Sequence, residues 1–192
     1  MDDELKVRVD TIVGNFHFRS LTADDKEIYM LAQAEEEVVA DFYQKYPDAL
    51  IANMSRALNN PDEHSIVAFQ RPCDQLIAIC SFQGLQKDTI ETGYTVVKEL
   101  QGKGIGTRMA REFVQLAHNC FPVREIYARV RVENIASRRV LEKVGAEFVS
   151  LADAPEVEII QRFIDENVEM SSRADALAAI ERGKNAVRVY RV

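Results

Sequence analysis

The stretch that decides the fold runs from residue 89 to residue 106 and reads TIETGYTVVKELQGKGIG. Its first part, residues 89–98, alternates in character as a strand does, so even-numbered and odd-numbered side chains lie on opposite faces. Three glycines follow, Gly102, Gly104 and Gly106, and a helical pattern begins directly after them. Glycine lets backbone N–H groups approach a ligand closely, and a helix start adds partial positive charge. This order of strand, glycine loop and helix predicts a site for phosphate or pyrophosphate.

The spacing of the glycines separates the phosphate-binding families that use this arrangement. A P-loop requires G-x-x-x-x-G-K-[ST], and no Lys-Ser or Lys-Thr pair follows a glycine at that distance. A dinucleotide-binding fingerprint requires G-x-G-x-x-G, whereas the third glycine of this loop comes one residue early. Neither pattern fits. For the loop taken alone, a tight turn that needs glycine only for its shape stays open as the alternative.

The rest of the chain predicts an α+β fold, with one domain over residues 1–192. Hydrophobic spacing and turn residues define the other elements. We expect strands at 16–19, 65–70, 75–83, 125–133, 147–151 and 186–192. We expect helices after an N-cap at Thr22, with Asp25 three residues on, and at 38–46, at 50–58, at 105–120 and from Asn134 to Gly145. Between the last two strands, residues 153–184 form an acidic insert with two amphipathic helices, one through Val157, Ile160, Ile164 and Val168 and one over 172–182.

The composition limits the classes of partner that the chain is expected to bind. Its 24 Lys and Arg against 31 Asp and Glu leave a net charge of −7, and nucleic-acid binding is disfavoured because phosphate neutralisation needs a clustered basic face. Aliphatic runs are far below the roughly 20 residues that span a bilayer, and the N-terminus MDDELKVRVD has no apolar signal segment. We therefore expect a cytoplasmic protein without a membrane partner. Three cysteines without C-x-x-C spacing and three scattered histidines predict no metal site.

Three motifs, in one order, resemble those of the GNAT acetyltransferase family. Residues 101–106 match Q/R-x-x-G-x-G/A, the acyl-CoA pyrophosphate loop of that family. Upstream, residues 91–94 (ETGY) resemble the E-x-G-Y strand of its ribosomal-protein N-terminal acetyltransferase branch. Downstream, residues 134–145 resemble the segment N-x-x-S-x-x-V-x-E-K-x-G. The resemblance implies a single-domain GNAT fold, a mixed and mostly antiparallel sheet flanked by helices, with acetyl-CoA as co-substrate and no metal.

The resemblance also implies a set of cofactor-binding residues. Main-chain groups of the last strand residues would pair with the pantetheine amides, and backbone N–H groups of the loop and first helical turn would surround the pyrophosphate. The implied set is Val96, Val97, Gln101, Gly102, Lys103, Gly104, Ile105, Gly106, Thr107, Arg108 and Asn134. For the side chains of Lys103 and Arg108 a solvated basic turn is the alternative, and for Asn134 a helix cap.

Acetyl transfer to an amine needs a proton acceptor, because an amine near pH 7 is mostly ammonium. Glu91 is the candidate base, with Glu99 in reserve and an exposed strand carboxylate as the alternative. Many members of the family place a tyrosine seven residues after the asparagine of the third motif, as the acid for the leaving thiolate. Leu141 stands there in this chain and cannot donate a proton. The ribosomal-type branch implies Ser137 in that role, with a small residue of the first helical turn as the alternative.

The expected function is therefore an acetyl-CoA-dependent N-acetyltransferase, in which a primary amine attacks the thioester directly. The acceptor would be a protein N-terminus or a small-molecule amine. A non-catalytic acyl-CoA-binding regulatory module is the alternative, motivated by Leu141, and a nucleotide-binding protein is a third reading of the loop. Acidic side chains of the insert would attract a cationic acceptor or simply form a solvated face. Exposed strand edges and an apolar insert helix allow a homodimer.

Overall fold

The computed structural model describes residues 8–33, 47–154, 157–158, 160–161, 164 and 173–192, and the fold below is that of these residues. The chain divides into two compact units, Met1–Tyr127 and Ala128–Val192. Antiparallel strands flanked by helices make up the structure, which confirms the α+β class. The expectation of one domain over residues 1–192 stays a prediction.

The first unit contains an antiparallel sheet in the strand order β1-β2-β3-β4-β5. Its strands are β1 (Asp10–Val13), β2 (Phe16–Ser20), β3 (Glu63–Gln70), β4 (Gln75–Gln83) and β5 (Thr89–Val96). The sequence-based prediction missed β1, because this strand is exposed over most of its length and therefore shows no apolar alternation.

The prediction for β5 was two residues too long. The strand ends at Val96, and Lys98, the expected last residue, begins a short 3₁₀ helix, η1 (Lys98–Leu100). In that turn the Leu100 N–H donates to the Val97 carbonyl oxygen at 2.9 Å. This local bond bends the chain out of the sheet and toward the glycine loop.

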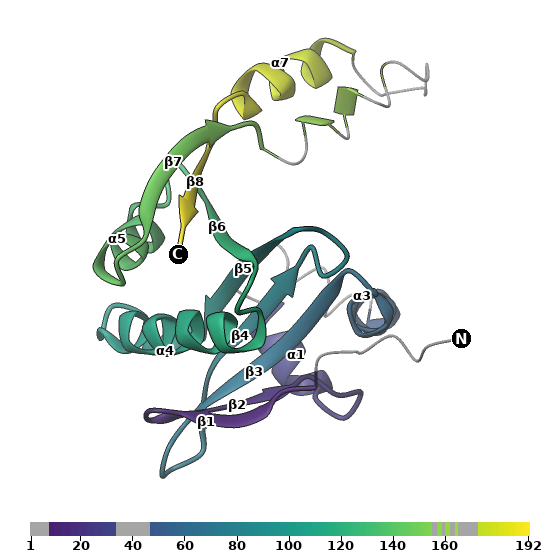
Figure 1. Ribbon diagram of the computed structural model, residues 1–192. Coiled ribbons are helices and arrows are strands. Elements are labelled where there is room, and N and C mark those ends of the chain that lie inside the picture. Colours follow the sequence, from purple (N-terminus) through teal and green to yellow (C-terminus); the bar gives the residue numbers. More distant parts are fainter. Residues whose placement is uncertain (1–7, 34–46, 155–156, 159, 162–163, 165–172) are drawn as a thin grey trace. The chain divides into compact units, whose positions relative to one another are not determined.

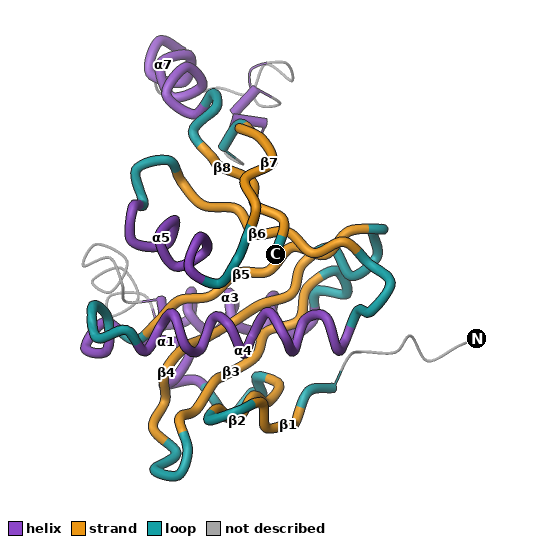
Figure 2. The backbone as a smooth tube through the Cα atoms, turned by 60° about the vertical axis from the view of Figure 1, so that its left-hand side comes forward, coloured by secondary structure: helices purple, strands orange, loops and turns teal. Residues whose placement is uncertain are grey.

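Helices cover both faces of the first sheet (Figures 1 and 2). One face carries α1 (Lys26–Gln33) and α3 (Pro47–Asn59), which pack on a buried cluster of Leu21, Tyr29, Met54 and Val67. The other face carries α4 (Ile105–Cys120), whose Phe113 ring stacks on Phe82 of β4 with 5.1 Å between centroids. The helix that the sequence predicts at 38–46 lies outside the described residues.

The strand register assigns the side chains of β5 to these two faces. Tyr94 lies opposite Cys80, and Cys80 Sγ is 3.8 Å from Met109 Sδ of α4, so the even-numbered side chains of β5 face α4. Thr95 lies opposite Ile79, which packs against the cluster under α1 and α3. The odd-numbered side chains, Glu91 among them, therefore lie on the α1 and α3 face.

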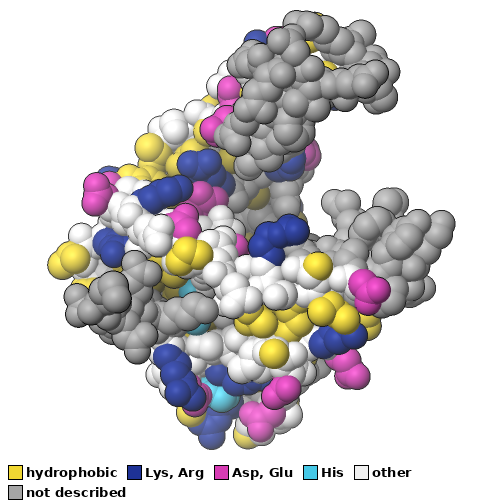
Figure 3. All heavy atoms as spheres, turned by 90° about the vertical axis from the view of Figure 1, so that its right-hand side faces the viewer, with side chains coloured by type: hydrophobic (Ala, Val, Ile, Leu, Met, Phe, Trp, Pro, Cys, Tyr) yellow, Lys and Arg dark blue, Asp and Glu magenta, His cyan; other side chains and the backbone are white. Residues whose placement is uncertain are grey.

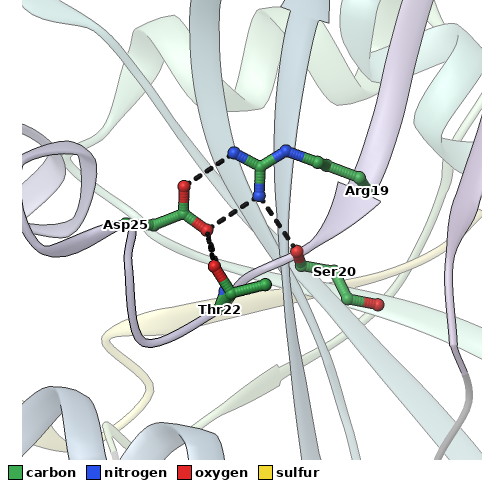
Figure 4. Close-up of polar contacts among 4 residues, drawn as sticks. All are labelled: Arg19, Ser20, Thr22 and Asp25. Carbon is green, nitrogen blue, oxygen red and sulfur yellow. Dashed lines mark hydrogen bonds and ion pairs between the residues drawn. The ribbon is translucent and has the colours of Figure 1, made fainter.

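The chain enters α1 through a buried ion pair, drawn in Figure 4. Both terminal nitrogens of Arg19 donate to the carboxylate of Asp25, at 2.6 and 2.7 Å, and Asp25 is only 6% exposed. The N–H and the hydroxyl of Thr22 donate to the same carboxylate, at 2.8 Å each. The hydrogen bond from Arg19 is the main cause that lowers the pKa of Asp25 to about 2. The helix begins at Lys26, and the Asp25 carbonyl accepts the Tyr29 N–H at 2.8 Å, so Asp25 stands at the N-cap position that the sequence pattern gives to Thr22.

The strand β6 (Glu125–Arg131) begins in the first unit and leads into the second, where the strand order is β6-β8-β7. Here β7 (Glu147–Ala152) and β8 (Val187–Arg191) are antiparallel. The core of this unit consists of Ala128, Val130, Leu141 and Tyr190. The predicted strand ended at residue 133, but a turn in which the Asn134 N–H donates to the Arg131 carbonyl ends it earlier.

The second unit also contains two helices described along most of their length, α5 (Ile135–Lys143) and α7 (Arg173–Gly183). The first confirms the short helix before Gly145, whose φ of +93° is the expected left-handed stop. The second confirms the second helix of the insert. Of the other insert helix, residues 157, 160 and 164 are helical, and Val168 lies outside the described residues.

Candidate functional site

The glycine loop of the first unit depends on two residues with left-handed backbone conformation. Gly102 has φ of +72° and Gly104 has φ of +77°, values that side chains other than glycine adopt with strain. A Cβ atom built on either residue would meet no described atom within 4 Å. Glycine is therefore needed here for the path of the backbone, and the space beside that backbone is open to a ligand.

The helix α4 starts on this loop without a side-chain cap. Gly104 is its N-cap residue and makes no side-chain hydrogen bond. The first bond of the helical ladder runs from the Arg108 N–H to the Gly104 carbonyl, at 3.4 Å. The N–H groups of Ile105, Gly106 and Thr107 precede that bond and have no acceptor within the helix. Together with the helix dipole, these donors suit a phosphate or pyrophosphate group.

Close packing fixes the start of α4 over the end of β5. A Cβ on Gly106 would lie 3.3 Å from Val96 Cγ2, so the helix and the strand are in tight contact at this point. The side chains of Ile105 and Met109, in the first turns of α4, are buried. From the other side, Gln101 Nε2 donates to the Val96 carbonyl at 2.9 Å. Gln101, predicted to bind cofactor, thus also ties the loop to the strand.

The main-chain groups at the end of β5 differ in their availability. The Val97 N–H donates to the Ile77 carbonyl of β4 at 2.8 Å, and the Val97 carbonyl accepts the bond from Leu100. Since neighbouring residues of a strand point their main-chain groups to opposite sides, those of Val96 project away from β4. The Val96 N–H therefore projects away from β4 and the Val96 carbonyl accepts the bond from Gln101, whereas both main-chain groups of Val97 are bonded to Ile77 and Leu100.

The two basic side chains of the loop region have local partners. Lys103 Nζ donates to the Glu99 carbonyl at 2.7 Å, which folds this side chain back over the loop. Arg108 is exposed and acts on Glu112, whose carboxylate accepts the Asn15 N–H at 3.0 Å. Burial raises the pKa of Glu112, and the charge of Arg108 opposes that rise. Both cationic side chains therefore lie near the start of α4, and each also interacts with another residue of the protein.

Glu91 is half-buried on the face of β5 opposite α4, which is the side of the sheet where α1 packs on β4 and α3 packs on β3. The strand register aligns it with Gln83 of β4 and Glu63 of β3, so two carboxylates and an amide form one row across three strands. Burial raises the pKa of Glu63. Beside Glu91 on this face, Gly93 leaves room, because an added Cβ would only reach ordinary contact distance, 3.4 Å from Ser81 Oγ. Sequence analysis missed this row, because only strand register reveals it.

Asn134 and Ser137 lie together in the second unit, at the start of α5. The Asn134 side chain accepts the Ser137 N–H at 3.0 Å, so Asn134 caps this helix, as its alternative interpretation held. Leu141, which follows Ser137 along α5, is 5% exposed and belongs to the core with Val130 and Tyr190. The structure thus brings the loop residues and Val96 together within the first unit, and Asn134 and Ser137 together within the second.

Three general features of the described residues concern possible partners. No helix among them is both long enough and apolar enough to cross a membrane. They contain no group of three or more His, Cys, Asp or Glu side chains arranged to hold a metal ion. On the face drawn in Figure 3, described basic side chains are interspersed with acidic and apolar ones. The expected absence of metal, membrane and nucleic-acid partners stays a prediction.

Comparisons with known proteins agree with the motifs. A family profile described as an acetyltransferase (GNAT) domain matches residues 15–147. The probable N-acetyltransferase YjcK of Bacillus subtilis (strain 168) is 28% identical over 134 residues, which are 68% of this chain and 72% of that protein.

Two solved structures show the same fold at low sequence identity. The ribosomal-protein alpha-N-acetyltransferase RimL in complex with coenzyme A has a TM-score of 0.64 and 12% identity, over 94% of this chain and 96% of that one. A chimera of the spermidine N-acetyltransferase SpeG from Vibrio cholerae and hSSAT has a TM-score of 0.61 and 17% identity, over 93% of each chain. With the profile match over more than half of its residues, the chain belongs to the GNAT acetyltransferase family.

Proposed function

We propose that this protein transfers the acetyl group of acetyl-CoA to a primary amine, which attacks the thioester directly. The observation that carries the proposal is the start of α4, where an open glycine loop precedes backbone N–H groups that no side chain caps. These donors bind the pyrophosphate of the co-substrate. The RimL structure of the same fold holds coenzyme A, which supports this ligand.

The end of β5 then holds the pantetheine arm. Val96 offers its N–H at the strand edge away from β4, and the arm pairs there as an added strand would. The Val97 groups keep their bonds to Ile77 and Leu100. Lys103 and Arg108 add positive charge at the pyrophosphate, and Gln101 holds the loop against the strand.

Glu91 accepts the proton of the incoming ammonium, directly or through one water molecule. The carboxylate lies on the face of β5 under α1 and α3, with the space beside Gly93 next to it. The acceptor amine approaches on this face, where Gln83 and Glu63 extend the polar row. Carboxylates in this row favour a cationic acceptor through attraction of opposite charges.

The acceptor is a primary amine of a protein N-terminus or of a small molecule. The relatives named above act on amines of both kinds, since one is a ribosomal-protein alpha-N-acetyltransferase and the other a spermidine N-acetyltransferase. The E-x-G-Y motif and Ser137 favour the ribosomal-protein branch. Ser137, at the start of α5, is the donor that this branch implies for the leaving thiolate. We expect the protein in the cytoplasm, and its exposed strand edges are compatible with a homodimer.

A second candidate function has one observation in its favour. Leu141 occupies the position of the usual acid and is a buried core residue. A domain that binds acyl-CoA and responds to it without catalysis would tolerate this residue. Turnover separates the two functions, because the regulatory module would bind acetyl-CoA and acetylate no amine.

The test combines acetyl-CoA binding with turnover on a panel that contains spermidine, a simple monoamine and a short peptide with a free N-terminus. We expect Glu91→Gln to lower kcat by roughly 100- to 10,000-fold, the usual contribution of a general base, with unchanged affinity for acetyl-CoA. Asp88→Asn makes the same change of charge on an exposed side chain nearby and should behave as the wild-type protein does.

Each experimental result leads to a different conclusion about the function. Unchanged transfer by Glu91→Gln would remove this carboxylate from the mechanism. Binding of acetyl-CoA without acetylation of any amine would favour the regulatory module. Absence of acetyl-CoA binding by the folded wild-type protein would contradict both functions.

A further inference from the structure

The hydroxyl of Tyr94 is shielded from solvent and has no hydrogen-bond partner among the residues that the structure describes. Buried polar groups in proteins are nearly always paired, because an unpaired one loses its bonds to water without replacement. Burial also raises the pKa of this phenol above its ordinary value. The group is therefore a protonated donor at neutral pH.

Tyr94 stands on the strand that leads from the phosphate-binding loop. Its side chain lies on the α4 face of β5, between Thr92 and Val96. Val96 is in contact with the first turn of α4, and Tyr94 follows one same-face repeat away, roughly 6.6–6.8 Å along the strand. On the other side, Thr92 uses its hydroxyl in a 3.2 Å bond to the Tyr127 carbonyl. Of these neighbours, Tyr94 is thus the one with an unused donor.

The same strand carries the proposed base on its opposite face. Glu91 points toward α1 and α3, where the acceptor amine approaches, whereas Tyr94 points toward the α4 side. In an attack on a thioester, the amine and the sulfur occupy different positions around the acyl carbon. A donor on the face opposite the base is therefore placed for the group that leaves.

We propose that the Tyr94 hydroxyl donates a hydrogen bond to the sulfur of CoA and stabilises the thiolate that leaves, an inference that rests on the proposed function. A bond forms between the amine nitrogen and the acetyl carbon, the carbon–sulfur bond breaks, and its electron pair stays on sulfur. The ammonium gives one proton to Glu91 and on to water before the attack, and the nitrogen loses a second proton by the same route as the amide forms. Tyr94 keeps its proton throughout, and the thiolate takes a proton from water on release. Leu141, buried in the second unit, has no donor to offer.

The test is the pH titration of the CoA thiol bound to the protein, followed by the ultraviolet absorbance of the thiolate. The variant Tyr94→Phe removes one oxygen atom. We expect the bound thiol to titrate at a pH about one to two units higher in Tyr94→Phe than in the wild-type protein, as for loss of a hydrogen bond to a charged group. The background contains the adenine of CoA, the tyrosines and the three thiols of the protein, so the titration is read as a difference from the same protein bound to desulfo-CoA, which has no thiol.

Two further variants, one control and one test of a competing donor, complete the experiment. Tyr127→Phe removes a hydroxyl that is exposed and donates to Glu125 at 2.9 Å, and it should titrate as the wild-type protein does. Ser137→Ala tests the other donor to the thiolate, the one that the family resemblance implies. A shift in Ser137→Ala without one in Tyr94→Phe would overturn the inference in favour of Ser137. An unchanged titration in Tyr94→Phe would likewise overturn it.

Failure of the proposed function is recognised separately, since a wild-type protein that gains no thermal stability from CoA has no bound thiol to titrate; that result would overturn both proposals.

A second measurement concerns the unliganded protein. Tyr94→Phe should unfold at the same temperature as the wild-type protein or a few degrees higher, because it removes an unpaired buried hydroxyl. A lower unfolding temperature would show that the hydroxyl already has a partner, and would contradict the inference.

Discussion

The two helices whose first turns carry the sequence motifs, α4 and α5, begin in opposite ways. At the start of α4 stands Gly104, with left-handed backbone and no side chain to cap the first N–H groups. At the start of α5 stands Asn134, whose side chain accepts the Ser137 N–H at 3.0 Å. One helix therefore leaves its N-terminal donors to a ligand, whereas the other satisfies part of them itself.

The difference follows from how each helix is stabilised. The 16-residue α4 buries six side chains, among them Met109 and Phe113, so packing holds it without a cap. The nine-residue α5 buries only Leu141, and short helices depend on their ends. A helix that is to bind an anion at its start must thus obtain its stability from its packed face. The start of α1, held by Arg19 and Asp25, shows a third solution, in which an ion pair fixes the entry.

The largest effect should come from a side chain placed at the open helix start. We expect Gly104→Val to abolish the stabilisation by acetyl-CoA, which is about 2.7 kcal/mol at roughly 100 times its dissociation constant. The branched side chain is strained at φ of +77° and fills the space beside the loop. Thermal shift with and without acetyl-CoA measures this loss.

A milder variant at the same position separates strain from obstruction. Gly104→Asn tolerates left-handed backbone, so its unliganded stability should stay close to that of the wild-type protein. Its affinity for acetyl-CoA should still fall, because the side chain occupies the open space. Wild-type affinity in both variants would show that the loop is only a turn.

The next effect concerns the ion pair at the start of α1 and depends on pH. Asp25 has a pKa of about 2 in the folded protein against 3.8 as the ordinary value, so its ionised form is favoured by folding. This contribution, about 2 kcal/mol, is fully present above pH 4 and is lost as the pH falls from about 4 toward 2. Urea unfolding across this range should show the loss in the wild-type protein.

The variant Asp25→Asn should be about 2 kcal/mol less stable near neutral pH, with a much flatter pH dependence below pH 4. Asp24→Asn is the matched control, since Asp24 is the exposed neighbour and should unfold like the wild-type protein. Parallel curves for the wild-type protein and Asp25→Asn below pH 4 would contradict the assigned role of Asp25.

The smallest effect should come from the cap of α5. We expect Asn134→Ala to cost about 1 kcal/mol of stability, the usual value for loss of an N-cap side chain. Asn134→Asp keeps an acceptor for the Ser137 N–H and should retain that stability. Urea denaturation of the three proteins measures the difference. If Asn134→Asp keeps its stability but loses affinity for acetyl-CoA, the residue contacts the ligand as well as the helix.

Much of the candidate site could be predicted because its features are local in the chain. Gly102 and Gly104 form the loop before α4 that the glycine pattern predicts, and Asn134 caps the helix that follows it. Turn and cap geometry depends on a few consecutive residues, so it is visible in sequence. The strand β1 escaped prediction, because exposure on both faces removes the apolar signal.

Contacts between distant segments could not be predicted in this way. Nothing in the sequence shows that Val97 uses its N–H on Ile77, or that Glu91 shares a row with Gln83 and Glu63. Both depend on the register of neighbouring strands, which is set by pairing across the sheet. The same register, together with the contact between Cys80 and Met109 of α4, decides which face of β5 carries the proposed base.

The sequence by itself determined most of the order of elements, the glycine loop and the family, because short-range backbone preferences and motif spacing follow from neighbouring residues in the chain. Only the tertiary structure decided which donors stay open. The uncapped start of α4 over Val96 and the unpaired hydroxyl of Tyr94 result from packing between segments far apart in sequence. Whether a polar group is satisfied depends on which atoms folding brings within hydrogen-bond distance, and that is a property of the folded structure.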